Sequence, residues 1–143
     1  SIRLKDICNK YFVYLMSATQ LNGEWKEAWT KGAQIDSTYI RGGKSIIDKA
    51  DGAMIILPIS KMEKKDIEEI LTKGFFKQPN YVTHIFKNRG NRVDKAKVFS
   101  HIDMGNMRIT DLFVTNVDNE LIEIKKLIIK SKQKEEPKKK FDF

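Results

Sequence analysis

The stretch Tyr81–Asp111, YVTHIFKNRGNRVDKAKVFSHIDMGNMRITD, decides the fold. An apolar run ends in Lys87-Asn88-Arg89-Gly90, and a basic turn leads into an alternating run and then a Gly-Asn turn. This order predicts a β-hairpin that continues into a further strand, and the alternating run consists of Ala96, Val98, Ser100 and Ile102. The hairpin would hold Lys87 and Arg89 side by side at the mouth of its turn. Two cations fixed by paired strands predict a phosphate-binding feature.

The bulk composition favours one soluble globular domain with a core of its own. The chain has 143 residues, of which 41% are hydrophobic and 32% are charged. The sequence contains neither an apolar run of membrane-spanning length nor a signal peptide, so we expect no membrane association. The single Cys8 excludes an internal disulfide and favours a reducing, cytoplasmic location. His84 and His101 fall on different predicted strands, so we expect no metal site.

The net charge of +8 is unevenly distributed. From Lys125 onward there are eight Lys and three acidic residues, so this tail carries +5 and the rest of the chain only +3. The pattern argues against a uniformly basic surface that coats nucleic acid. The basic places are therefore the tail and the hairpin.

The beginning of the chain predicts half of an α/β unit. Helical spacing of apolar residues predicts a helix over Ile2–Lys10, and Tyr11–Ala18 is typical of a buried strand. The lack of an initial Met and of a preceding strand favours an excised domain. Gln20 follows the strand, where α/β folds place ligand-contacting groups, so it could contact a phosphate or a water. The competing interpretation of Gln20 is a capping amide in a loop.

A glycine turn follows in Ile40–Asp51, IRGGKSIIDKAD. Gly43-Lys44-Ser45 imitates the end of a phosphate-binding loop, but Thr38 occupies the place of the first glycine, so this match fails. A glycine turn that opens a short helix remains, and Arg41 and Lys44 near its start suit a nucleic-acid backbone. Ala53–Ile59 is expected to form the next buried strand.

The rest of the chain predicts three further parts. Ser60 and Glu63 form a capping box that opens a charged helical insertion over residues 60–74. A final helix is expected over residues 118–134, capped by Asp118 or Asn119, and a disordered basic tail over residues 135–143. Residues 1–117 form the main domain in this interpretation.

Three of these pieces, in this order, resemble the carboxyl-terminal half of the RecA-like motor of DnaB-type replicative helicases, with features of a phage branch. SATQLN at residues 17–22 is similar to the family's SQLNR. IRGGKSIIDKAD is similar to its LRESGSIEQDAD, and FKNRGN to its K-x-R-x-G hairpin. The resemblance covers roughly residues 1–115. It implies a partial RecA-like α/β fold, with a mixed sheet, a β-hairpin and flanking helices.

The resemblance also implies roles for individual residues. Gln20 matches the sensor of the nucleotide's terminal phosphate, and Arg89, with Lys87 beside it, matches the arginine finger that reaches a neighbouring subunit's nucleotide. Arg41, Gly42 and Lys44 match the loop that contacts single-stranded DNA. Gly42 replaces a glutamate of the family and Lys44 replaces a glycine, while Gly90 lies one place beyond the usual hairpin glycine. These departures weaken the match of the DNA loop and of the hairpin geometry.

By the same resemblance, ATP and Mg²⁺ are the cofactors of the complete motor, and residues absent from this chain bind most of both. The chain alone is therefore expected to be inactive. Single-stranded DNA, a hexameric ring of identical subunits, and a primase or helicase loader are the implied partners. Two alternatives stay open. One is a non-catalytic basic module that binds nucleic acid or a helicase, and the other is a small α/β protein with a generic phosphate-binding hairpin.

Overall fold

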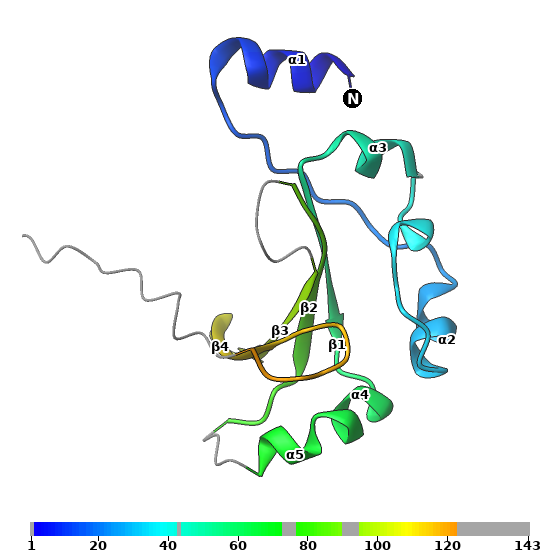
Figure 1. Ribbon diagram of the computed structural model, residues 1–143, viewed down its shortest axis with the longest axis vertical. Helices are drawn as coiled ribbons and strands as arrows, with labels where there is room; N and C mark the ends of the chain where they lie inside the picture. Colours follow the sequence, from blue (N-terminus) through cyan, green and yellow to red (C-terminus); the bar gives the residue numbers. More distant parts are fainter. Residues whose placement is uncertain (1, 43, 73–76, 90–94, 123–143) are drawn as a thin grey trace, which may run out of the picture.

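The computed structural model describes residues 2–42, 44–72, 77–89 and 95–122. It is a mixed α/β structure built around one four-stranded sheet (Figure 1). The helices are α1 (Ile2–Tyr11), α2 (Trp25–Thr30), η1 (Ser37–Tyr39, a 3₁₀ turn), α3 (Lys44–Lys49), α4 (Lys61–Asp66) and α5 (Glu68–Leu71). The strands are β1 (Gly52–Pro58), β2 (Tyr81–Asn88), β3 (Ala96–Asp103) and β4 (Arg108–Thr115).

The sheet has the order β1-β2-β3-β4, and every neighbouring pair is antiparallel. The predicted hairpin and its following strand are therefore confirmed as β2, β3 and β4. The predicted mixed sheet is wrong for the described residues, because none of their strand pairs is parallel. Residues 90–94, which follow Arg89 in the predicted hairpin, lie outside the described residues.

One row of side chains crosses all four strands and forms the centre of the core. Strand register places Leu57, Val82, Phe99 and Phe113 next to one another on the same face, and all four are buried. Phe99 and Phe113 stack with ring centroids 4.8 Å apart. Alternation in β3 therefore directs Phe99 to the centre of the core. The sequence analysis singled out the residues of the other face, Ala96, Val98, Ser100 and Ile102. Apolar burial of this row is the main term that stabilises the sheet.

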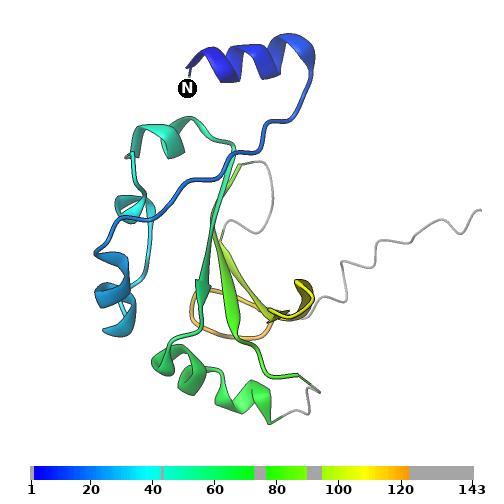
Figure 2. The same ribbon diagram turned by 180° about the vertical axis from the view of Figure 1, so that it is seen from behind.

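Residues of α2 and α5 and of the segments beside them pack against this face of the sheet. Trp29 of α2 is buried there, and its indole Nε1 donates a hydrogen bond of 2.8 Å to the carbonyl of Pro58. Ile67 and Ile70 belong to the same cluster. The predicted insertion at 60–74 thus contributes to the core as well as to the surface. Figures 1 and 2 show α4 and α5 at one end of the sheet and α1 beyond its other end.

The insertion begins where the sequence predicts. Ser60 Oγ accepts a hydrogen bond of 3.1 Å from the Glu63 amide, which confirms the capping box. The helix is broken at Ile67 into α4 and α5, and Met62 is half exposed instead of packing inward. The predicted helix end at Gly74 lies outside the described residues.

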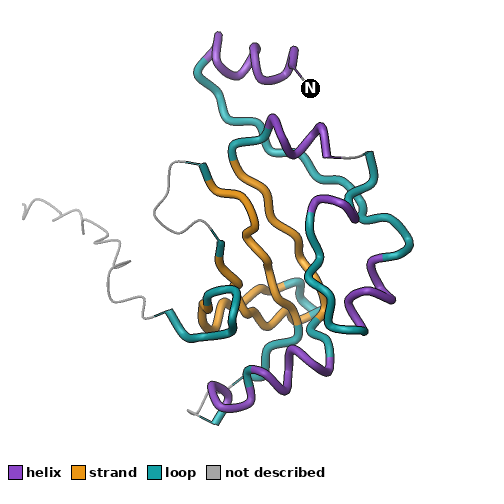
Figure 3. Tube along the Cα trace, turned by 45° about the vertical axis from the view of Figure 1, so that its right-hand side comes forward, coloured by secondary structure: helices purple, strands orange, loops and turns teal. Residues whose placement is uncertain are grey.

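The predicted buried strand over Tyr11–Ala18 is wrong. Tyr11 ends α1 and the following residues to Ala18 are irregular and exposed. Phe12, Tyr14 and Met16 are 93%, 105% and 82% exposed. A strand needs neighbours that satisfy its backbone groups, and no described residue pairs with this segment. Figure 3 shows it as a loop between α1 and the rest of the chain.

The predicted final helix does not begin at Asp118. Residues 117–119 form a turn, and Leu121 makes a β-bridge with Thr115. The Asn116 side chain accepts hydrogen bonds from the amides of Asp118 and Glu120, and this competes with a helical start. The remainder of that predicted helix and the predicted tail lie outside the described residues. No helix in the described ranges combines the length and apolarity that crossing a bilayer requires.

The central row makes a quantitative prediction about stability. Phe99→Ala should lower the free energy of unfolding by about 3–5 kcal/mol, because truncation leaves a cavity in a closed core. Phe12→Ala is the matched control and should change it by less than about 0.5 kcal/mol, because Phe12 is exposed. Urea denaturation followed by circular dichroism measures both. A cost for Phe12→Ala as large as that for Phe99→Ala would contradict this packing.

Candidate phosphate-contacting site at helix α3

Helix α3 is the element around which the predicted site residues gather. It has six residues, and a helix this short is marginal without interactions beyond its own backbone. Its last carbonyl groups have no acceptor role within the helix, so they need donors from elsewhere. Cations suit this position because the carbonyl end of a helix carries partial negative charge.

Lys87, near the end of β2, supplies donors to these carbonyls. Its Nζ donates hydrogen bonds to the carbonyl oxygens of Ile47 and Asp48, the latter at 3.1 Å. Strand register and the packing of Ile47 against the core bring the two elements together. Lys87 thus caps α3, and the structure gives it a role that the sequence pattern did not suggest.

Arg89 reaches the same helix end from one residue beyond β2. Its Nη2 donates to the carbonyl oxygen of Asp48 at 3.2 Å, so Lys87 and Arg89 share this acceptor. The Arg89 amide donates to the Asp51 carbonyl at 2.8 Å, and its Nη1 lies 3.8 Å from Asp51 Oδ1. The two predicted cations do lie side by side, and Arg89 remains 55% exposed.

A third cation, which the sequence analysis missed, comes from α1. Lys5 Nζ donates to the carbonyl of Lys49 at 3.3 Å and to Asp51 Oδ1 at 3.2 Å. Its partners lie 44 and 46 residues away in sequence, so only the folded chain reveals the contact. Lys5 is also the described link between α1 and the C-terminal end of α3.

Gln20 and Arg41 meet on the other side of α3. The Arg41 amide donates to the Gln20 carbonyl at 2.9 Å, and Thr19 Oγ1 donates to the Arg41 carbonyl at 3.3 Å. Leu21 and Ile40 form a β-bridge next to them. Gln20 therefore does not end a strand as predicted. It lies in an exposed segment whose backbone is fixed to the glycine turn.

The glycine turn leads directly into α3. Gly42 has a φ of +98°, and a Cβ there would lie 3.3 Å from Ile46 Cδ1, so both backbone and space favour glycine. Arg41 is exposed, and Lys44 is the first residue of α3. The Lys44 side chain is outside the described part of the structure. Arg41 is thus exposed to solvent, and its backbone is fixed by the hydrogen bond to the Gln20 carbonyl.

These contacts divide the predicted residues into two groups joined by one helix. Gln20, Arg41 and Gly42 lie where α3 begins, and Lys87 and Arg89 lie where it ends. Both ends carry exposed cations that could contact phosphate oxygens. Within the described ranges, no cluster of three or more His, Cys, Asp or Glu side chains could hold a metal ion.

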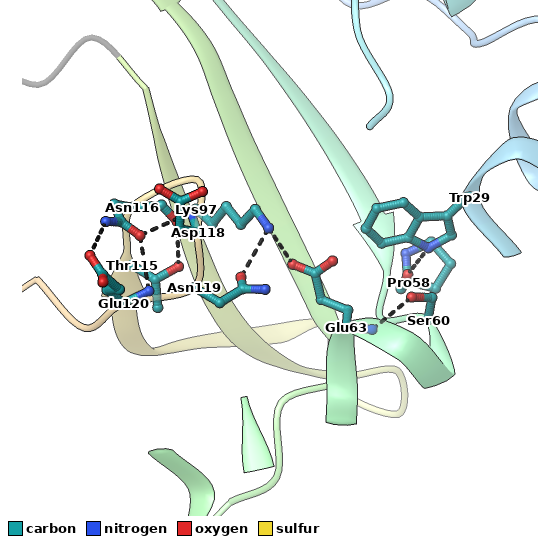
Figure 4. A network of polar contacts seen from close by, with 10 residues as sticks. All are labelled: Trp29, Pro58, Ser60, Glu63, Lys97, Thr115, Asn116, Asp118, Asn119 and Glu120. Carbon is teal, nitrogen blue, oxygen red and sulfur yellow. Dashed lines mark hydrogen bonds and ion pairs between the residues drawn. The ribbon is translucent and has the colours of Figure 1, made fainter. Parts of the chain in front are cut away.

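A buried ion pair elsewhere was also missed (Figure 4). Lys97 Nζ donates to Glu63 Oε1 at 2.8 Å and to Asn119 Oδ1 at 2.9 Å, and both charged side chains are 8% exposed. It ties β3 to α4 and to the segment after β4. A period-two pattern that includes Phe99 puts Lys97 on the inward face, and this was the available signal.

His84 lies beside that ion pair and against Trp29, with ring centroids 5.4 Å apart. Burial first, and then the charge of Lys97, lower the pKa of His84 to about 4. Its Nε2 is buried and has no hydrogen-bond partner in the described structure. His84 is thus a neutral strand residue at neutral pH, consistent with the sequence interpretation.

The fold and site define a mixed α/β protein in which one short helix joins two exposed cationic positions. The chain is 66% identical over 131 residues to an SPbeta prophage-derived uncharacterized protein, YorI, of Bacillus subtilis strain 168. The match covers 92% of this chain and 26% of the prophage protein, so the chain spans about a quarter of that relative's length. No family model and no solved structure matches the chain.

Acid should destabilise the fold through His84. The histidine pKa is about 4 when folded and about 6.5 when unfolded, so the unfolded chain binds the proton more readily. The free energy of unfolding should therefore be lower at pH 4 than above pH 6.5, by up to roughly 3 kcal/mol. His84→Gln should remove this part of the loss, whereas the control His101→Gln should retain it. Urea unfolding at pH 7.5 and 4.5 measures the difference, and an unchanged pH dependence in His84→Gln contradicts it.

Proposed function

We propose that this chain is the carboxyl-terminal part of a RecA-like motor in a DnaB-type replicative DNA helicase. In this proposal it supplies three contacts to a ring that couples ATP hydrolysis to movement on single-stranded DNA. Gln20 senses the terminal phosphate, the Arg41–Gly42–Lys44 turn contacts DNA, and Arg89 with Lys87 serves a neighbouring subunit's nucleotide. The observation that carries the proposal is that the Gln20 segment is bonded to the Arg41 turn that leads into α3, while Lys87 and Arg89 are bonded to the end of the same helix.

The exposure and the hydrogen bonding of the Arg89 side chain support a role at a phosphate. A guanidinium group has five N–H donors in a planar fork, and one described hydrogen bond of Arg89 goes to Asp48. The side chain is 55% exposed, so the remaining donors can meet an incoming anion. A cation held in place stabilises the charge that develops during phosphoryl transfer.

The nucleotide itself must be held elsewhere in this proposal. Gly43-Lys44-Ser45 is preceded by the 3₁₀ turn η1 and a single β-bridge at Ile40, whereas a phosphate-binding loop follows a strand. ATP and Mg²⁺ would therefore bind mainly to parts of the motor beyond this chain. The chain alone would be inactive, and the nucleotide near Arg89 would belong to the neighbouring subunit of a hexamer.

The exposed segment from Phe12 to Met16 supports a contact between this chain and another part of the motor. A run of large exposed apolar side chains is costly in water, and larger exposed apolar patches usually mark an interface. In the proposed motor this segment would pack against the nucleotide-binding half, which is formed by residues outside this chain.

The remaining parts of the proposal concern location and partners. The motor would act in the cytoplasm of a bacterium or of a phage-infected host, and the similarity to a prophage-derived protein supports this setting. A primase or helicase loader would be a further partner. A second candidate is a non-catalytic module that binds nucleic acid or a helicase, and it is favoured by the fact that both hairpin cations already have acceptors in their own chain.

Removal of the Arg89 side chain tests the enzymatic proposal. In the complete polypeptide that carries this sequence, Arg89→Ala should lower kcat for ATP hydrolysis by about 10³-fold or more, because a finger acts in the transition state. ATP affinity should stay within about threefold. Arg108→Ala, an exposed arginine at the start of β4, is the control and should hydrolyse normally. Normal turnover in Arg89→Ala favours the non-catalytic module.

Salt dependence tests the DNA turn. Binding of a fluorescent single-stranded oligonucleotide by the assembled protein should weaken steeply with salt, because phosphate contacts release counterions. Arg41→Ala should reduce the slope of log K against log salt by about 0.7, the value for one phosphate contact on a single strand. Arg108→Ala should keep the slope. A slope unaffected by Arg41→Ala would remove Arg41 from the DNA contact.

A further inference from the structure

Asp51 contacts both the backbone and the guanidinium group of Arg89, and no motif of the sequence analysis assigned it a role. It lies immediately before β1 and meets Arg89 at two points. Its carbonyl oxygen accepts the Arg89 amide at 2.8 Å, and its carboxylate oxygen Oδ1 lies 3.8 Å from Arg89 Nη1. One contact fixes the backbone of Arg89, and the other attracts its guanidinium group.

Local strand geometry places these two residues opposite each other. Gly52 pairs with Asn88 at the end of the β1–β2 ladder, and the register shifts between Ala53 and Met54. Such a bulge re-aims the residues at the end of a strand pair. The Asp51–Arg89 contact therefore extends the ladder by one residue, just where the strands separate.

We propose that Asp51 is a positioning residue that aims the Arg89 guanidinium at the neighbouring subunit's phosphate. This inference rests on the proposed function and adds to it the group that orients the finger. A free arginine side chain samples many rotamers, and holding it before the phosphate arrives removes that entropy from the barrier. The Asp48 carbonyl at 3.2 Å supplies the second anchor for Arg89.

Lys87 acts as a brace in this arrangement. Its two hydrogen bonds to Ile47 and Asp48 fix the end of β2 against α3. Lys5 approaches the same Asp51 Oδ1 at 3.2 Å, so the carboxylate lies between two cations, Lys5 and Arg89. Because Lys5 lies on α1, a shift of α1 would change the orientation of Asp51. The carboxylate of Asp51 thus attracts Arg89, whereas Lys5, a second cation at the same oxygen, repels it.

The contact is too exposed to be a stabilising device. Asp51 is 72% exposed and Arg89 55% exposed, and ion pairs this exposed contribute little to folding because water and salt screen them. The favourable effect of the contact is that it orients one long side chain, that of Arg89. A change that removes the carboxylate charge should therefore alter turnover and leave unfolding almost unchanged.

Asp51→Asn in the complete ATP-hydrolysing ring tests the proposal. It removes the charge and keeps both side-chain size and the backbone acceptor. We expect kcat to fall roughly 10- to 100-fold, as expected for a misplaced catalytic group, with KM for ATP and DNA affinity within twofold. The unfolding midpoint should not change. Asp111→Asn, an exposed carboxylate on β4 that accepts from Ser100, is the control and should hydrolyse normally.

A double-mutant comparison separates positioning from a general structural effect. Asp51→Asn should have no further effect in an Arg89→Ala background, because the residue acts only through the finger. An additional loss there, or a normal kcat in the single variant, overturns the positioning role. Normal turnover in Arg89→Ala overturns the proposed function and this inference with it. Lost turnover in Arg89→Ala with normal turnover in Asp51→Asn overturns this inference alone.

Discussion

The contact between the carbonyl end of α3 and the cations Lys87 and Arg89 is the constraint on which the site depends. A six-residue helix cannot satisfy all of its last carbonyls, and the end of β2 supplies donors to those of Ile47 and Asp48. The same contact fixes two long cationic side chains that would otherwise move freely in solvent. Because α3 follows the Arg41–Gly42 turn directly, the arrangement also ties the cations to that turn.

The sheet makes this contact possible by fixing where β2 ends. The row from Leu57 through Val82 and Phe99 to Phe113 sets the register of all four strands, and a slip by one residue would turn these side chains to the other face. Correct register puts Lys87 and Arg89 beside the end of α3. The packing of the core and the geometry of the site are thus consequences of the same strand alignment.

Local signals predicted the antiparallel strands and the Ser60 cap, because alternation, turn residues and capping act over a few residues. The failures have non-local causes. Tyr11–Ala18 has the composition of a strand, but a strand also needs partners, and the described residues supply none. Lys97 was missed because a lysine usually faces water, and its burial depends on Glu63, 34 residues earlier.

The candidate site also has parts that local sequence predicted and parts that depend on contacts between distant residues. Sequence order identified Gln20, Arg41, Lys87 and Arg89 as residues of interest. The structure bonds Gln20 to Arg41 just before α3, and it bonds Lys87 and Arg89 to the end of that helix. The contacts of Asp51 and Lys5 could not be found from the sequence, because they join positions 38 and 46 residues apart. Nor could the pattern show that Lys87 and Arg89 already bind their own backbone. These hydrogen bonds hold the side chains of Lys87 and Arg89 in a fixed orientation.

The most direct test is an experimental structure of the complete ring with single-stranded DNA and a transition-state analogue of ATP hydrolysis. The account predicts that Arg89 lies within hydrogen-bonding distance of the terminal phosphate analogue bound by the neighbouring subunit. Lys87 should still be hydrogen-bonded to the end of its own α3. A structure in which Arg89 contacts no nucleotide, in its own or a neighbouring subunit, would contradict the account.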